Sequence, residues 1–161
     1  MDGGKYTIFQ VAKWFLLKDS MTLKRLQKLC YYAQAWFYTL KDLKLCNTEF
    51  EAWVHGPVSK TLWDQLKQKY YSSTPLYDFD YSDLPSNTED ITDPDDLELL
   101  EMVWATYGDQ CGTALEALSH SEEPWIKARG SIGSEEKSNN IITLESMKNY
   151  YSKIYTGNYG E

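Results

Sequence analysis

The sequence predicts a mainly α fold, and three observations support this. Apolar residues recur at helical spacing in six or seven separate segments, whereas the strand–helix alternation of a parallel sheet is missing. A chain of 161 residues with 42% apolar residues has the size of one compact domain. We therefore expect a single domain over residues 1–161, with a core at about 7–155. We also expect six to seven helices, with room for a short strand pair near 45–54 or 76–82.

The first two helices follow from their apolar faces. The first is expected over 7–18, where the apolar positions are Ile8, Val11, Ala12, Phe15 and Leu16. Thr22 is a suitable N-cap for a second helix that continues to about Leu40. Its inner face is expected to hold Leu26, Leu29, Cys30, Ala33, Phe37 and Leu40.

Residues 45–54 fit either a short extended segment or a distorted helical turn, and both alternatives stay open. A glycine and a proline then follow at 56 and 57. Glycine tolerates unusual backbone angles and proline suits the first position of a helix, so we expect a rigid corner and a third helix from Pro57 to about Tyr71. This corner would direct Trp53 and His55 either into the core or toward a partner.

The second half contains shorter elements. Residues 76–92 are expected to form a long surface loop, and Asp93 to cap a helix that ends at Gly108. Its inner stripe would be Leu97, Leu100, Trp104 and Tyr107. Helices are expected at 113–118, at 122–129 with Ser121 as the cap, and at 143–155, with a polar loop over 130–140.

Composition narrows the class of protein. No apolar run reaches the roughly 18 residues of a membrane helix, and the first residues do not resemble a signal peptide. The three cysteines are odd in number and scattered, so free thiols in a reducing cytoplasm are expected. The two histidines and three cysteines lack the close pairing of a structural zinc site, and no phosphate-binding glycine loop occurs, so we expect no cofactor.

Charge is distributed unevenly along the chain. Residues 70–126 contain fourteen acids and no Lys or Arg. Eleven bases and six acids precede this acidic span, and five bases and four acids follow it, so the three parts carry +5, −14 and +1, which gives the net charge of −8. The span could attract a basic partner or could simply be a solvated face. It opposes nucleic-acid binding, for which Lys24, Arg25 and Lys28 form only a small basic patch.

Three motifs occur in a fixed order. The first is Leu26-Gln27-Lys28-Leu29-Cys30-Tyr31-Tyr32-Ala33-Gln34, and the second is Glu51-Ala52-Trp53 followed by Gly56-Pro57-Val58. The third is Leu118-Ser119-His120-Ser121-Glu122-Glu123-Pro124-Trp125. Together they resemble the Panacea domain, the SocA/GepA-like antitoxin family that often accompanies toxin genes and prophages. The resemblance covers roughly 11–151.

The resemblance implies a mostly helical, cytoplasmic, bacterial or phage-encoded antitoxin that neutralises a toxin protein by direct contact. It carries over no catalytic residue, so we expect no enzyme. The charge of this chain suggests that the toxin is basic. The alternatives are a proteolytic adaptor, whose second partner is a protease, or a phage-encoded host-interaction protein. The least favoured alternative function is a small hydrolase that uses His55 or His120.

Two groups of residues are singled out. The candidates for partner contact are Lys28, His55, Pro57, Lys60, Tyr77, Phe79, Asp80 and Tyr81. The motif residues expected to be structural are Leu26, Gln27, Leu29, Tyr32, Trp53, Gly56, His120, Pro124 and Trp125. Ser119, His120 and Glu122 contain the groups of a hydrolytic site, but residues so close in sequence seldom converge on one point.

Overall fold

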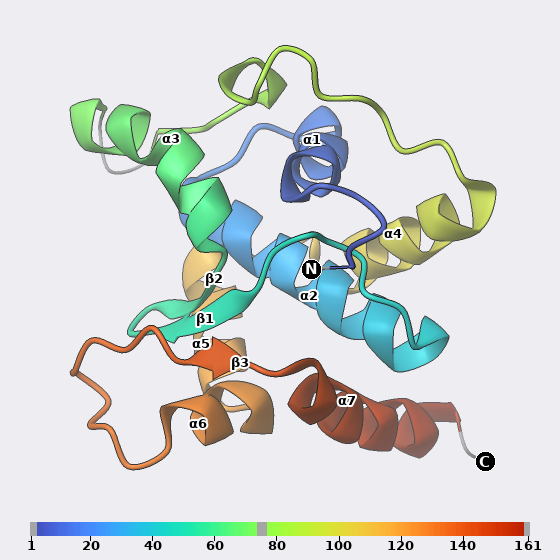
Figure 1. Ribbon diagram of the computed structural model, residues 1–161, viewed down its shortest axis with the longest axis vertical. Coiled ribbons are helices and arrows are strands. Elements are labelled where there is room, and N and C mark those ends of the chain that lie inside the picture. Colours follow the sequence, from blue (N-terminus) through green and yellow to red (C-terminus); the bar gives the residue numbers. More distant parts are fainter. Residues whose placement is uncertain (1–2, 74–76, 160–161) are drawn as a thin grey trace.

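Helix α2 (Leu23–Lys41) runs through the middle of the computed structural model, which describes residues 3–73 and 77–159 (Figure 1). Every residue from 26 to 37 is buried. A helix buried on all sides must have neighbours all around it, and α2 packs against α1 (Ile8–Lys18), α4 (Pro94–Tyr107), α5 (Gly112–His120) and α7 (Leu144–Tyr159).

The remaining elements complete a mainly α fold. Helices α3 (Lys60–Ser72) and α6 (Glu123–Arg129) bring the number in the described residues to seven, with one 3-10 turn, η1 (Tyr81–Asp83). Strands β1 (Phe50–Trp53), β2 (Gly56–Val58) and β3 (Ile141–Ile142) form an antiparallel sheet in the order β2-β1-β3. The predicted fold class is confirmed. None of the helices in the described ranges has the length and apolar character needed to cross a bilayer.

Local sequence signals place three helix starts correctly. Thr7 and Gln10 form a capping box before α1, Thr22 caps α2, and Asp93 caps α4. In each case a side-chain oxygen accepts a hydrogen bond from a backbone N–H that lacks a partner within the helix. The inner face predicted for α1 is buried throughout.

The predicted start of the third helix at Pro57 is wrong. Pro57 lies in β2 opposite Ala52 of β1, and Ser59 caps α3 three residues before Leu62. A proline is tolerated there because β2 is an edge strand, which does not need every N–H for pairing. The extended alternative for 45–54 is therefore the correct one, since β1 lies within it and forms a hairpin with β2.

The other position considered for the strand pair, 76–82, contains no strand in the part of that range that the structure describes. Leu76 lies outside the described residues. From Tyr77 onward the chain makes one isolated bridge, between Phe79 and Met21, and then enters η1. The long loop around it passes alongside α1 on its way to α4, as Figure 1 shows, and η1 contacts α1.

Three smaller expectations also need correction. Ser121 does not cap α6, because its hydroxyl donates back to the carbonyl of Leu118 and Glu122 is the N-cap residue. Leu40 is 39% exposed, since α2 extends past the core in its last turn. On α4 the buried positions include Leu99 and Val103, whereas Leu97 and Trp104 are only partly buried. The buried face of α4 is therefore turned about the helix axis relative to the predicted face.

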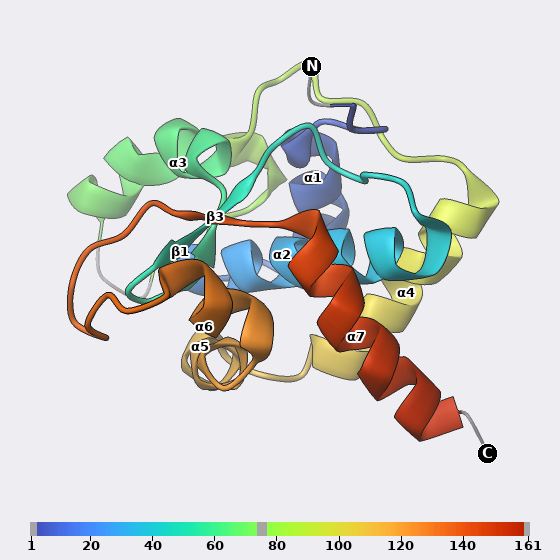
Figure 2. The same cartoon turned by 60° about the horizontal axis from the view of Figure 1, so that its bottom comes forward.

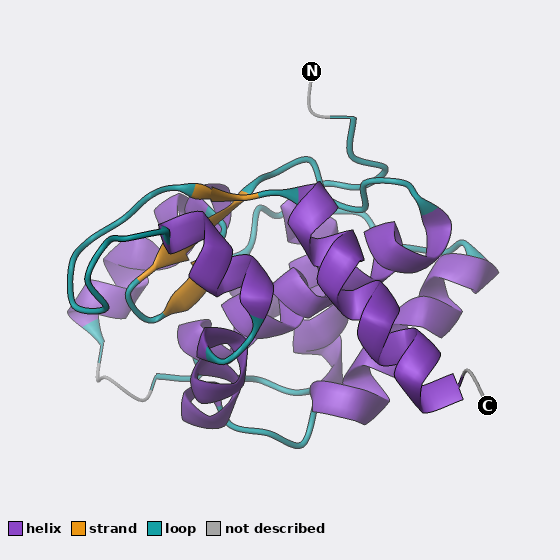
Figure 3. Cartoon of the chain, turned by 90° about the horizontal axis from the view of Figure 1, so that it is seen from below, coloured by secondary structure: helices purple, strands orange, loops and turns teal. Residues whose placement is uncertain are grey.

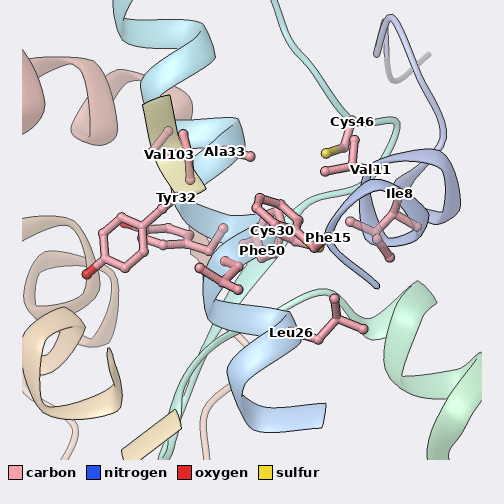
Figure 4. Packing of buried hydrophobic residues seen from close by; sticks show 14 of the residues in the cluster. Ile8, Val11, Phe15, Leu26, Cys30, Tyr32, Ala33, Cys46, Phe50 and Val103 are labelled. Atoms are coloured by element: carbon pink, nitrogen blue, oxygen red, sulfur yellow. The ribbon is translucent and has the colours of Figure 1, made fainter. Parts of the chain in front are cut away.

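The core lies mainly around α2. Figure 4 shows Leu26, Cys30, Tyr32 and Ala33 of this helix among side chains from α1, α4 and β1. Helices α5, α6 and α7 cover α2 from one side in Figure 2. The small sheet lies at one end of the molecule beside α3 and α6, as Figure 3 shows, and this end carries the candidate site.

Candidate partner-binding surface

The three sequence motifs meet at the β1–β2 hairpin. Gln27 of α2 donates from Nε2 to the Ser59 carbonyl at 3.0 Å and accepts from the Ser59 N–H at 2.8 Å. Because Gln27 is buried, this two-way contact replaces the hydrogen bonds that both groups would make with water. The first motif therefore holds the end of the second in place, just before α3 begins.

Lys28 lies directly beneath the hairpin. Its side chain is 1% exposed, and Nζ donates to the Pro57 carbonyl at 3.3 Å. Burial lowers the pKa of Lys28 to about 7. Gly56 has a φ of +108°, and a Cβ there would come within 2.4 Å of Lys28 Cε. Glycine is needed at this position for its backbone angle and for the space that the lysine occupies.

The third motif closes the hairpin from the other side. Trp125 donates its indole N–H to the Trp53 carbonyl at 2.9 Å, and the His120 ring stacks on Trp125 with centroids 4.0 Å apart. Burial lowers the pKa of His120, and its Nε2 is buried without a hydrogen-bond partner in the described residues. Pro124 is buried as well. His120, Pro124 and Trp125 thus contribute to packing.

A polar network links the first and third motifs inside the core. The Glu122 carboxylate accepts hydrogen bonds from the hydroxyls of Tyr32, at 2.8 Å, and Tyr151, at 2.7 Å. Burial raises the pKa of Glu122, although the two hydroxyls act in the opposite direction. The ring of Tyr32 also stacks on Tyr107 at 4.0 Å. Leu26, Leu29 and Tyr32 are fully buried, so these motif residues lie in the core.

The groups of a hydrolytic site are present but do not converge. The Ser119 hydroxyl donates to the Glu116 carbonyl, and the Ser121 hydroxyl to that of Leu118, so both are bound within α5. Glu122 faces two tyrosines. A nucleophile needs a base within hydrogen-bonding distance, with a third group that orients the base. In the described residues no group of three or more His, Cys, Asp or Glu side chains could hold a metal ion.

A groove with aromatic walls opens on the outer side of the hairpin. We call it the hairpin groove; its walls come from the hairpin, α3 and the 130–140 loop. Trp63 is the central ring, with its centroid 5.8 Å from that of Trp53 and 5.7 Å from that of Tyr71, at interplanar angles of 72° and 86°. Tyr71 is 72% exposed. The main side chains of the groove are Glu51, Trp53, His55, Lys60, Trp63, Tyr71, Glu135 and Lys137.

Two predicted contact residues, His55 and Lys60, belong to this groove. The side chain of His55 is 72% exposed and its Nδ1 lies 3.0 Å from Glu116. The side chain of Lys60 is 59% exposed and pairs with Asp64 at 3.0 Å. Trp53, expected to be a core anchor, is instead only partly buried, and its indole N–H donates to Glu51 at 2.8 Å. The outer rim of the hairpin is therefore exposed while its backbone is held by the core.

The other predicted contact residues differ in how exposed they are. Lys28, Pro57 and Phe79 are buried, so they are not available at the surface, and their assignment to partner contact is corrected. Phe79 is inside because its backbone pairs with Met21. Tyr81 is 54% exposed, whereas Tyr77 and Asp80 are partly buried. None of these last three lines the hairpin groove.

The acidic span is largely folded back onto the basic N-terminal part. Asp96 is 2% exposed and pairs with Lys5 at 2.8 Å and Lys41 at 3.1 Å. Further pairs join the two parts over 14 to 92 residues of sequence: Lys5–Asp93, Lys13–Asp90, Lys18–Glu101, Lys24–Glu116 and Lys69–Asp83. Among the described residues, six exposed acids of the span have no ion pair: Asp78, Glu89, Asp95, Glu98, Asp109 and Glu123.

Sequence reasoning missed the central rings of the groove. Trp63 was not among the candidate residues, and Tyr71 was named only as the expected end of the third helix. The signal was nevertheless present, because residues seven and eight positions apart lie on the same face of a helix. Trp63, Tyr70 and Tyr71 fit this spacing, and their rings contact one another in the structure.

Comparison with known proteins gives one match. The family model described as antitoxin SocA-like, Panacea domain, matches residues 26–126, which is more than half of the chain. The search of curated proteins and the search of solved structures found no match. The matched range includes all three motifs, and these are the segments that the structure brings together.

Proposed function

The chain belongs to the SocA-like Panacea-domain antitoxin family, and we propose that it binds and neutralises a partner toxin by direct protein contact. The observation that carries the proposal is the placement of the family motifs. Two polar residues of the first motif, Gln27 and Lys28, are used inside the molecule to hold the hairpin. They leave a rigid hairpin whose outer side is free for contact.

The hairpin groove is the surface that we propose for the toxin. Exposed aromatic side chains are costly to keep in water, and Trp and Tyr supply a large share of binding energy at protein interfaces. Tyr70 is 40% exposed and Tyr71 72% exposed, on a helix end that projects from the molecule in Figure 1. The hairpin forms one wall of the groove, and Gln27 and Lys28 bind the hairpin backbone from the core, which fixes the position of that wall.

We further propose that the protein acts without catalysis. The hydroxyls of Ser119 and Ser121 bind to their own helix, and His120 is stacked on Trp125, an arrangement that favours a packing role. The thiols of Cys30 and Cys46 are free and buried, which fits the reducing cytoplasm that we propose as its compartment.

Charge supports a basic toxin. Many carboxylates of the acidic span form ion pairs within the molecule. The six exposed acids without ion pairs are still available to a partner, and the chain carries a net charge of −8. A negative surface speeds association with a positive partner and does so less at high salt. An association rate that is the same at low and high salt would contradict this part of the proposal.

Co-expression tests the proposal as a whole. We expect the toxin to be encoded by a short reading frame beside this gene. That frame is expressed alone and then together with this protein, and growth arrest is expected in the first case and rescue in the second. Toxin half-life is measured in the same cells. An unchanged half-life supports inhibition by binding, whereas a shortened one indicates a proteolytic adaptor. Failure of rescue with a folded protein would contradict the antitoxin role.

A further inference from the structure

We propose that the hairpin groove binds an arginine side chain presented by the partner protein. The proposal rests on the proposed function, since it names the chemistry by which the toxin would be recognised. Three features of the groove support it: the orientation of its aromatic rings, the presence of carboxylates without ion pairs, and the pairing of nearby basic side chains with acids outside the groove.

The rings provide flat surfaces for a planar cation. Trp63 meets Trp53, Tyr70 and Tyr71 edge to face, and a contact of this kind covers one face of only one of the two rings. A guanidinium group is attracted to the face of an aromatic ring within about 6 Å, and most strongly to that of tryptophan. The same side chain can stack parallel to the ring.

The carboxylate of Glu51 is positioned beside these rings. Its Oε1 accepts the indole N–H of Trp53 at 2.8 Å, which holds the carboxylate against the aromatic wall. Glu51 has no ion pair with any described residue, and the same is true of Glu135 on the facing loop. Glu51 is only partly exposed, so a cation that reached it would be partly removed from water. An ion pair in such a place is stronger than one in bulk solvent.

Most of the nearby basic groups are already paired with acids outside the groove. His55 contacts Glu116 and Lys60 contacts Asp64, and neither of these acids lines the groove. Lys137 is exposed and has no ion pair in the described part of the chain, so it offsets one of the two free carboxylates. The groove lining itself carries two carboxylates and two lysines; because Asp64, outside the groove, neutralises Lys60, one carboxylate of the groove is left without a counter-charge.

Arginine fits this combination better than lysine does. Its planar guanidinium can lie on a ring and donate two parallel hydrogen bonds to one carboxylate at the same time. An ammonium group is a compact, strongly hydrated charge that gains less from the flat walls. The proposal thus predicts a preference for arginine that a simple electrostatic attraction would not give.

The test uses the full-length protein labelled with ¹⁵N and three short peptides. The peptides are acetyl-Gly-Arg-Gly-amide, the same peptide with lysine, and the same peptide with citrulline, the neutral isostere of arginine. The indole N–H resonances of Trp53 and Trp63 are assigned from Trp→Phe variants. Saturable shifts of both resonances are expected with the arginine peptide, and at least about tenfold weaker binding with the citrulline peptide.

Variants make the test specific to the groove. Glu51→Gln is expected to weaken binding of the arginine peptide about tenfold, and Tyr71→Ala about threefold or more. Glu49→Gln is the matched control, because Glu49 is an exposed acid two residues away that pairs with Lys44 and does not line the groove. Equal binding of the citrulline peptide, shifts unaffected by Glu51→Gln, or no shift of either indole would overturn the proposal.

Failure of arginine binding can be distinguished from failure of the antitoxin role. If the arginine peptide does not bind but co-expression still rescues growth, the proposed function stands and this inference is wrong. If the peptide binds as expected but no rescue occurs, the groove recognises arginine on some other partner and the antitoxin role is wrong.

Discussion

Lys28 and Gly56 share one space beneath the hairpin. The lysine side chain extends from α2 under the glycine, and its amino group reaches the Pro57 carbonyl at 3.3 Å. A Cβ at position 56 would lie 2.4 Å from Lys28 Cε, which is closer than carbon atoms can approach. The first motif therefore places a lysine side chain where the second motif has a glycine and leaves room for it.

The first prediction is that Gly56→Ala destabilises the protein by about 2–4 kcal/mol. The substitution adds backbone strain at a φ of +108° and a clash with a buried side chain. Chemical denaturation monitored by tryptophan fluorescence measures the change. Gly130→Ala is the control, because Gly130 also has a positive φ, +59°, but a Cβ there would meet nothing within 4 Å.

A double-variant cycle separates the two causes of that loss. In the Lys28→Ala background the clash is removed and only the strain remains, so Gly56→Ala should cost clearly less there than in the natural protein. An equal cost in both backgrounds would show that the contact with Lys28 is not responsible.

The second prediction concerns pH. Because burial lowers the pKa of Lys28 to about 7, the folded protein binds fewer protons than the unfolded chain between pH 7 and about 10. Stability therefore rises with pH in this window, by roughly 1 kcal/mol per pH unit from this group alone. Other groups near Lys28 also act on it: Glu116 raises its pKa and Lys24 lowers it.

Lys28→Met tests the pH prediction, since methionine has a similar length and no charge. The variant is expected to lose the rise between pH 7 and pH 10, and to be at least as stable as the natural protein at pH 7. The quantity to compare is the difference in unfolding free energy between the two proteins at each pH. A constant difference across the window would show that folding does not lower the pKa of Lys28.

The third prediction concerns the acidic span. Hydrogen bonds from Lys5, Tyr6 and Lys41 lower the pKa of Asp96, although burial acts in the opposite direction. Asp96→Asn leaves both lysines without their main counter-charge and should cost roughly 2–3 kcal/mol near neutral pH. Since a lowered carboxylate pKa stabilises the fold only where the carboxylate is ionised, this cost should be constant above about pH 5 and should shrink as the pH falls below about 4.

Asp42→Asn is the matched control for Asp96. Asp42 pairs with Lys148 at 2.7 Å, but its side chain is 66% exposed, so its loss should cost less than about 1 kcal/mol. Asparagine also tolerates the positive φ of 59° at this position. Equal losses for the two variants would contradict the view that the acidic span is fastened to the N-terminal part through Asp96.

Sequence patterns predicted the helices because their causes are local. The caps at Thr7, Thr22 and Asp93 act within three residues, and the apolar face of α1 has one simple period. Pro57 was misassigned because a Gly-Pro pair fits both a helix start and an edge strand. The choice between them depends on pairing with β1, and on Ser59, which Gln27 holds from a different helix.

The candidate site was predicted only in part, for a related reason. His55 and Lys60 were named as candidates near the expected Gly56-Pro57 corner, and both line the groove. The burial of Lys28 could not be read from its neighbours in sequence, because a lysine beside an apolar face normally extends into water. The carbonyl that it binds and the glycine that makes room for it lie nearly thirty residues away.

The last prediction is that the hairpin groove contributes to toxin binding and little to folding. Tyr71 is 72% exposed, so Tyr71→Ala should change the unfolding free energy by less than about 1 kcal/mol. If Tyr71 is one of the aromatic side chains that anchor the toxin, the same variant should weaken toxin binding by about 2 kcal/mol, or roughly thirtyfold, and reduce rescue in co-expression.

Leu43→Ala is the control, since Leu43 is an apolar residue that is 56% exposed and does not line the groove. Because both substitutions remove exposed apolar surface, a general effect of surface polarity would appear in both variants. Loss of rescue in Tyr71→Ala alone would place the toxin on the groove, and full rescue by a stable Tyr71→Ala protein would place it elsewhere.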